Sequence, residues 1–137
     1  MEEERKWSYN MNDNIDWDHD SMYCFINFSN HPSDKWDNSQ REAALEYGEI
    51  IDIPFPNVDP DFSELDIDLL SDKYVREITE YDPAAVMCQG EFTLCFSLAQ
   101  KLQALGITVL SACSKRDVVE KDGKKISVFR FVKFREY

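Results

Sequence analysis

Residues 84–93 read Ala-Ala-Val-Met-Cys-Gln-Gly-Glu-Phe-Thr, an apolar and β-prone run that stops at a small polar cluster. The same design recurs where residues 24–28 meet Ser-Asn-His, where 50–53 meet Pro-Phe-Pro-Asn, and where 107–110 meet Ser-Ala-Cys-Ser-Lys-Arg. Helix-like stretches separate these runs. Strands that alternate with helices predict a parallel sheet, and ligands of such sheets bind beyond the carboxyl ends of the strands. We therefore expect the four polar clusters to meet at one edge.

Working outward from these runs predicts the remaining elements. Strands are expected at residues 23–28, 49–53, 85–88 and 107–110, and helices at 39–47, 64–81 and 92–105. Asp122-Gly123 before an alternating run at 126–134 is a strong hairpin signal. The predicted fold is α/β and Rossmann-like, with three layers. It has a mostly parallel sheet of about four strands, helices on both faces and a C-terminal antiparallel hairpin.

Two features of the predicted helices are specific enough to test. Ser39 and Glu42 have the spacing of a capping box, which predicts the start of the first helix. In the second helix an apolar series follows a helical period, which predicts its core-facing side: Leu65, Leu69, Leu70, Tyr74, Val75 and Ile78.

Length and composition favour one domain at residues 23–137, preceded by a flexible acidic leader at 1–22 that contains Trp7 and Trp17. The chain has no run of the roughly 18 apolar residues that a membrane span needs, and nothing resembles a signal peptide. The four cysteines have no short paired spacing, which favours buried free thiols. We expect a cytoplasmic protein without membrane contact.

The net charge of −12 is unevenly distributed. Residues 1–20 carry −5, residues 21–114 carry −11 and residues 115–137 carry +4, from eight bases and four acids. So acidic a chain is not expected to bind duplex nucleic acid through phosphate contacts. A small anion stays possible where local donors outweigh the distant charge. The concentrated positive charge begins at Lys115 and Arg116, so we expect an anion site to use it.

The turn at residues 89–93 is a candidate ligand site. Gly90 permits a backbone conformation closed to other residues, and the helix that follows attracts anions to its N-terminus. Thr93 adds a hydroxyl donor, Gln89 can read the edge of a base or ribose, and Glu91 can accept from a ribose hydroxyl. The alternative is a tight turn in which Glu91 favours the helix dipole.

His31 directly follows the first strand and is the candidate for proton transfer, since histidine exchanges protons near neutral pH. Ser29 and Asn30 beside it can donate hydrogen bonds to an oxyanion. The alternative is a turn histidine whose ring bonds a backbone carbonyl.

The fourth polar cluster supplies Ser111, Ser114, Lys115 and Arg116. Two hydroxyls and two cations suit a phosphate; the alternative is a solvated turn into the hairpin. After the second strand, Asn57 can donate its amide to the same ligand.

Other chemistries fit the sequence poorly. It contains no Walker loop, no G-x-G-x-x-G turn and no G-x-S-x-G elbow. Neither a C-x-x-C motif nor a histidine pair predicts a metal site. The acids at residues 59–68 lack the glycine of a calcium loop, so they are expected to cap the second helix. We expect no metal and no cofactor.

These motifs resemble those of the small CRISPR-associated Rossmann-fold (CARF-like) proteins of prokaryotic defence systems. The resemblance covers residues 23–137 and rests on three stretches: Phe-Ser-Asn-His-Pro at 28–32, Gln-Gly-Glu-Phe-Thr at 89–93, and Ser-Ala-Cys-Ser before the basic pair at 111–116. It implies binding of a cyclic oligoadenylate second messenger, commonly across a homodimer. Members called ring nucleases cleave the messenger without a metal ion.

The resemblance also implies roles for residues. His31 would be the acid or base, with Lys115 and Arg116 clamping the phosphate. Two rivals stay open. One is a nucleoside-processing enzyme of the deoxyribosyltransferase type, in which Glu91 or Asp52 attacks a sugar carbon. The other is a non-catalytic interaction module.

Overall fold

The computed structural model describes residues 23–137; the predicted leader at 1–22 lies outside them. The strands are β1 (Cys24–Ser29), β2 (Glu49–Pro54), β3 (Ala85–Cys88), β4 (Thr108–Lys121) and β5 (Lys124–Glu136). The helices are α2 (Asn38–Leu45), α3 (Glu64–Thr79) and α4 (Phe92–Ala104), and a short 3-10 helix, η2, covers Ser33–Lys35.

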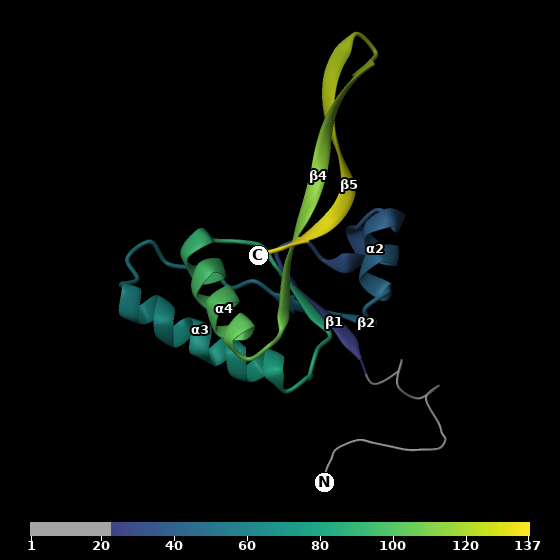
Figure 1. Cartoon of the computed structure of the whole chain (residues 1–137). Coiled ribbons are helices and arrows are strands. Elements are labelled where there is room, and N and C mark those ends of the chain that lie inside the picture. The colour runs from purple at the N-terminus through teal and green to yellow at the C-terminus, as the bar shows by residue number, and fades with distance from the viewer. Residues whose placement is uncertain (1–22) are drawn as a thin grey trace, which may run out of the picture.

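The strands form one sheet in the order β2-β1-β3-β4-β5 (Figure 1). The first four run parallel and β5 runs antiparallel to β4. The predicted α/β class, the mostly parallel sheet and the C-terminal hairpin are thus confirmed. The sheet has five strands instead of about four, because β5 pairs with β4 along its whole length.

The core has two layers, one on each face of the sheet. Phe28 and Val86 pack on the face covered by α3 and α4. Phe25 and Met87 point to the opposite face, toward α2. All six residues of β1 and all four of β3 are buried, as expected of central strands covered on both sides.

The start of α2 differs from the prediction. Asp37 is the N-cap, and its carboxylate accepts from the backbone N–H of Gln40 at 3.2 Å. The Ser39 hydroxyl donates to Asp37, so the capping box expected at Ser39 is wrong. In α3, Ser63 and Asp66 form a capping box, which confirms that acids of this segment cap the second helix.

Four members of the predicted apolar series lie in the core or pack against it: Leu70, Tyr74, Val75 and Ile78. The other two, Leu65 and Leu69, are exposed, by 63% and 56%. The buried stripe of α3 is Ile67, Ser71, Tyr74 and Ile78. Leu65 and Leu69 are two residues out of phase with Ile67 and Ser71 and lie on the opposite side of the helix. The predicted series is therefore confirmed in the second half of α3 and wrong in the first.

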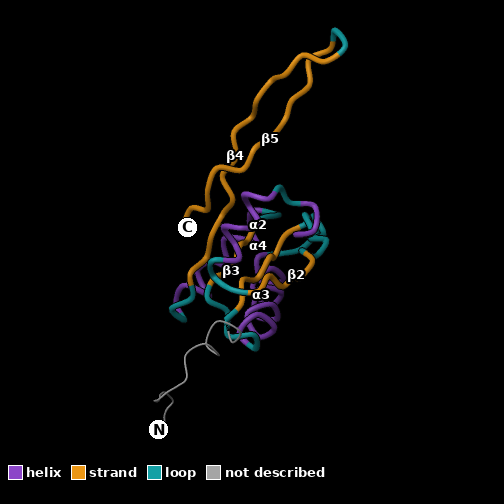
Figure 2. Tube along the Cα trace, turned by 90° about the vertical axis from the view of Figure 1, so that its right-hand side faces the viewer, coloured by secondary structure: helices purple, strands orange, loops and turns teal. Residues whose placement is uncertain are grey.

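The predicted end of the fourth strand at Leu110 is wrong. β4 runs on to Lys121 and, with β5, forms a two-stranded ribbon that projects from the body (Figures 1 and 2). The chain turns at Asp122 and Gly123, both with φ in the left-handed region, at 55° and 76°. Polar residues at 111–116 suggested a turn, but a solvent-exposed ribbon also accepts polar side chains.

None of the helices within residues 23–137 combines the length and the hydropathy that a membrane crossing requires.

Candidate functional site

The carboxyl ends of β1 and β3 lie side by side at the centre of the sheet. From β1 the chain turns to α2 on one face, and from β3 it turns to α4 on the other (Figure 1). Such a switch point leaves a crevice between the two diverging connections, where ligands of open parallel sheets bind.

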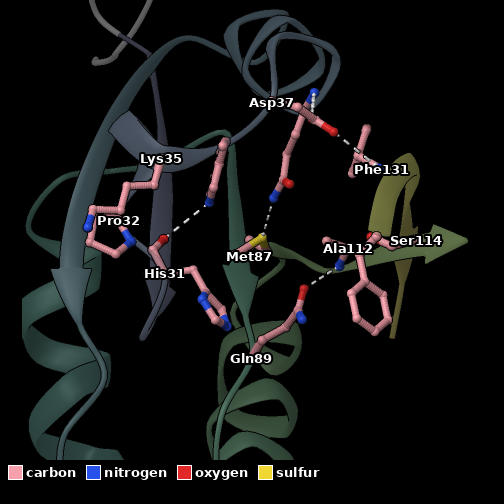
Figure 3. A pocket seen from close by; sticks show the side chains of 12 residues that line it. His31, Pro32, Lys35, Asp37, Met87, Gln89, Ala112, Ser114 and Phe131 are labelled. Carbon is pink, nitrogen blue, oxygen red and sulfur yellow. Dashed lines mark hydrogen bonds between the residues drawn. The ribbon is translucent and has the colours of Figure 1, made fainter. Parts of the chain in front are cut away.

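A cavity of about 430 Å³ opens at this point, on the α2 face, between α2 and the base of the ribbon. We call it the ribbon-base cavity (Figure 3). Its volume is within the range of small-molecule sites. Four segments line it: His31, Pro32, Lys35, Trp36, Asp37 and Gln40 around α2, Met87 and Gln89 from β3, Ala112 and Ser114 from β4, and Phe129 and Phe131 from β5.

The turn that presents His31 is built around its own backbone. The His31 carbonyl accepts from the Asn27 amide at 2.9 Å and from the Trp36 indole N–H at 3.1 Å. The buried Ser29 hydroxyl donates to Asn27 Oδ1 at 2.7 Å and accepts from the His31 N–H at 3.1 Å. Within residues 23–137 the imidazole of His31 makes no hydrogen bond, and it points into the cavity (Figure 3).

Asp52, the possible nucleophile of the rival transferase, supports this turn. Its carboxylate accepts from the buried Asn27 amide at 2.9 Å and from the Ser33 N–H and hydroxyl at 3.2 and 3.1 Å. The carboxylate is therefore occupied in joining β2, β1 and η2.

Gln89, directly after β3, bonds to both neighbouring strands, to β1 through its backbone and to β4 through its side chain. Its backbone N–H donates to the Phe28 carbonyl at 3.1 Å, and its side-chain carbonyl accepts from the Ala112 N–H. The side-chain NH₂ has no partner within residues 23–137, so it remains a donor for a ligand in the cavity (Figure 3).

A β-bulge shapes the ribbon side of the cavity. Cys113 pairs with Lys133 and Ser114 with Phe131, so Val132 is an extra residue in β5. Because the insertion resets the alternation, Phe131 and Phe134 point to the same face, and their ring centroids lie 4.9 Å apart. Without the bulge, one of them would point to the α4 side.

Asp37 ties the ribbon to α2. Its carboxylate accepts from the Phe131 N–H at 3.3 Å, besides capping α2. Burial raises the pKa of Asp37, but hydrogen bonds from the Gln40 and Phe131 N–H groups and the Ser39 hydroxyl outweigh it and hold the pKa below its ordinary value. The carboxylate is therefore ionised near neutral pH, and its hydrogen-bonding capacity is used within the protein.

Replacing Asp37 by alanine is expected to lower the free energy of unfolding by about 1 kcal/mol at pH 7, since an N-cap is lost. The contribution of Asp37 is present above its ordinary pKa and is lost as the pH falls through the lower pKa of the folded state. Urea unfolding at pH 7 and at acidic pH checks both points. Asp34→Ala, at an exposed η2 position, is the control; equal losses would contradict the assignment.

A second cavity of about 470 Å³ lies on the α4 face. Gln89, Gly90, Phe92, Cys95, Phe96, Ser111 and Tyr137 line it.

Gly90 has an ordinary φ, so the expected special backbone conformation is wrong. Glycine is needed here because a Cβ would lie 2.5 Å from the ring of Phe55, which is buried.

Three titratable groups meet beside this cavity. The Cys88 and Cys95 thiols are hydrogen-bonded, which raises the pKa of the fully buried Cys88 and lowers that of Cys95. Burial raises the pKa of Tyr137, whose hydroxyl donates to the Cys88 carbonyl. All four cysteines are free thiols, as expected, and Cys113 is the one that is only partly buried.

Glu91 and Thr93 are engaged in the N-cap of α4. The Glu91 carboxylate accepts from the Thr93 hydroxyl at 2.6 Å and from the Leu94 N–H at 2.8 Å, and these bonds lower its pKa. The site thus has the geometry of a capped tight turn. A ligand role for either residue stays a prediction.

With this geometry established, the chain can be compared with known proteins. The model of the Uncharacterized protein MJ1673 family matches residues 23–135, from the residue before β1 to the last residue but one of β5. The chain belongs to the MJ1673 family. The search of curated proteins returned no match to the sequence.

In this MJ1673-family chain, the ribbon-base cavity brings together three predicted site residues: His31, Gln89 and Ser114. Gln89, Gly90 and Ser111 line the second cavity. Neither cavity is lined by the other predicted residues, which are Ser29, Asn30, Asn57, Glu91, Thr93, Lys115 and Arg116.

Lys115 and Arg116 do not form a joint clamp. Successive residues of a strand point to opposite faces, so Arg116 shares the face of the cavity residues Ser114 and Phe129, whereas Lys115 faces away. Arg116 Nε donates to the Ser127 hydroxyl at 3.0 Å.

Sequence reasoning missed Lys35, Trp36, Gln40, Phe129 and Phe131 in the MJ1673-family cavity. One signal was available for the two phenylalanines, because their spacing of two places both rings on one face of the expected hairpin. What the spacing could not show was that this face meets α2.

Proposed function

We propose that the ribbon-base cavity binds a nucleotide, that this ligand is a cyclic oligoadenylate, and that His31 takes part in cleaving it. One observation carries the proposal: an imidazole and a carboxamide NH₂ that have no hydrogen-bond partner among residues 23–137 share an aromatic-lined cavity at the switch point of the sheet. The domain is then a Rossmann-like, cytoplasmic ring nuclease of antiviral defence, as the resemblance of its motifs implies.

Aromatic rings supply the recognition of a base. Trp36 is held by its indole N–H bond to the His31 carbonyl, and Phe131 is buried beside it. Phe129 lies at the solvent side of the cavity and is 69% exposed, which leaves its ring free to stack on a ligand. The NH₂ groups of Gln89 and Gln40 can donate to ring nitrogens of adenine.

Cationic and hydroxyl groups supply the contacts to phosphate. Lys35 lines the cavity and forms no ion pair within residues 23–137, and Ser114 presents a hydroxyl opposite it. Arg116 lies on the same face of the ribbon as Ser114, two residues further from the body. Asp37 is the acid among the cavity residues, and its carboxylate already accepts from the Gln40 and Phe131 N–H groups, so the cations Lys35 and Arg116 remain for a phosphate.

The cleavage that fits these residues needs no metal ion. A ribose 2′-hydroxyl attacks the adjacent phosphorus in line and the bond to O5′ breaks, which leaves a 2′,3′-cyclic phosphate and a 5′-hydroxyl. The attacking oxygen loses one proton and O5′ gains one. His31 transfers one of these protons and water transfers the other, while the cations stabilise the transition-state charge.

The rival enzyme is less well supported. Its nucleophile would be Asp52 or Glu91, and each of these carboxylates already accepts hydrogen bonds from two groups of the protein. A nucleophilic carboxylate instead needs a free lone pair directed at the sugar carbon.

The direct test is to incubate the protein with cyclic tetra- and hexa-adenylate in the presence of a chelator. Chromatography is expected to show linear products that end in a cyclic phosphate. Binding by calorimetry without turnover would remove the cleavage step, and neither binding nor turnover would refute the proposal.

Replacing Phe129 by alanine is expected to weaken binding of the cyclic oligoadenylate roughly 5- to 150-fold, since stacking contributes about 1–3 kcal/mol per base. Calorimetric Kd values measure the effect. The matched control is Phe92→Ala, which removes an 89% exposed ring that lines the other cavity. A larger loss in the Phe92 variant would move the site to the α4 face.

A further inference from the structure

Among residues 23–137, none covers either face of the outer part of the ribbon. Residues 114–130 are exposed or partly exposed throughout, although several are apolar. Val119, Ile126 and Val128 form a cluster on one face, and Val118 and Phe129 lie on the other. A two-stranded hairpin with exposed apolar side chains has marginal stability in water. We therefore interpret the outer part of the ribbon as a protein-binding surface.

The start of α3 and the residues just before it form a second apolar surface that is exposed within residues 23–137, which we call the α3 patch: Phe62, Leu65 and Leu69. Exposed acids surround it: Asp61, Glu64, Asp66 and Asp68. A patch of this kind on a monomer commonly marks a protein interface.

The two surfaces have opposite charge. Residues 115–137 carry +4, and residues 61–76, which include the α3 patch, carry −3, from five acids and two bases. The ribbon combines apolar side chains with lysines and arginines, whereas the α3 patch combines them with aspartates and glutamates. Two copies of the ribbon would repel each other, so the charges favour contact between a ribbon and an α3 patch.

The contact cannot form within one molecule. The ribbon projects from the side of the body opposite to α3 in both views (Figures 1 and 2). We propose that the ribbon docks on the α3 patch of a second copy of this chain, and that the exchange is reciprocal. Two such contacts related by a two-fold axis close the assembly as a dimer. This inference does not depend on the proposed function.

Charge reversal tests the pairing. We expect sedimentation velocity to show a dimer for the wild-type chain and a monomer for two variants: Lys124→Glu/Lys125→Glu on the ribbon and Asp61→Lys/Glu64→Lys beside the α3 patch. In an equimolar mixture both contacts regain opposite charges, so the dimer is expected to return. Glu42→Lys/Glu46→Lys on α2 changes exposed acids elsewhere and is expected to remain dimeric.

A ribbon truncation tests the arm itself. Deleting residues 118–121 and 124–127 shortens each strand by four residues and leaves Asp122-Gly123 as the turn between Asp117 and Val128, which already pair. Because the number removed from each strand is even, the remaining side chains keep their faces. This variant is expected to be monomeric, with the far-UV circular dichroism of a folded body. Three outcomes would each overturn the proposal: a monomeric wild type, a mixture of the two charge variants that stays monomeric, or growth into open polymers.

Discussion

Replacing His31 by alanine is expected to slow cleavage of a cyclic oligoadenylate by about 10²–10⁴-fold, the usual contribution of a general acid or base. Binding is expected to change by only a few fold, because the ring lies among the cavity residues without a structural partner within residues 23–137. The turn is expected to persist, since its hydrogen bonds use the backbone of His31. Single-turnover rates and calorimetric Kd values separate the two effects.

Two controls sharpen this expectation. Lys115→Ala removes a cation from the ribbon face that points away from the cavity and is expected to change neither quantity, whereas Arg116→Ala is expected to weaken binding. Equal losses of binding and of rate in the His31 variant would argue against proton transfer by His31.

Replacing Gly90 by alanine is expected to destabilise the fold by about 1–3 kcal/mol, the cost of overpacking a core. The new methyl group would lie 2.5 Å from the ring of Phe55. That ring cannot easily move, because it is buried and packs against Phe28 with centroids 4.8 Å apart. The free energy of unfolding in urea measures the loss.

A double-mutant cycle identifies the cause of this loss. Phe55→Ala alone is expected to cost about 3–5 kcal/mol, but in that background Gly90→Ala has no ring to meet and should cost little more. Additive losses would show that the backbone at Gly90, rather than the Phe55 ring, demands glycine.

The elements that sequence reasoning placed best are those with a local cause. The β3 bounds were predicted at 85–88 and observed there, because a short apolar run lies between Pro83 and a polar turn. The hairpin at Asp122-Gly123 was predicted from the left-handed backbone that such a turn needs.

The errors all concern choices that no local signal decides. The polar residues 111–116 fit a turn or an exposed ribbon equally well, and only the pairing with β5 makes them a strand. Leu65 and Leu69 follow the same period as the true core stripe of α3. The N-cap of α2 is Asp37 instead of the predicted Ser39, and the Asp37 carboxylate also accepts from the Phe131 N–H of β5.

The sequence by itself determined the order of strands and helices along the chain, and it placed His31 and Gln89 at the carboxyl ends of two strands of a parallel sheet, since period, turn residues and proline act over a few residues. Only the tertiary structure decided which of the polar residues share a cavity and which aromatic rings line it. That choice depends on the bulge at Val132 and on how α2 meets the ribbon. Contacts between segments so far apart in the chain are set by the packing of the whole domain and leave no local pattern.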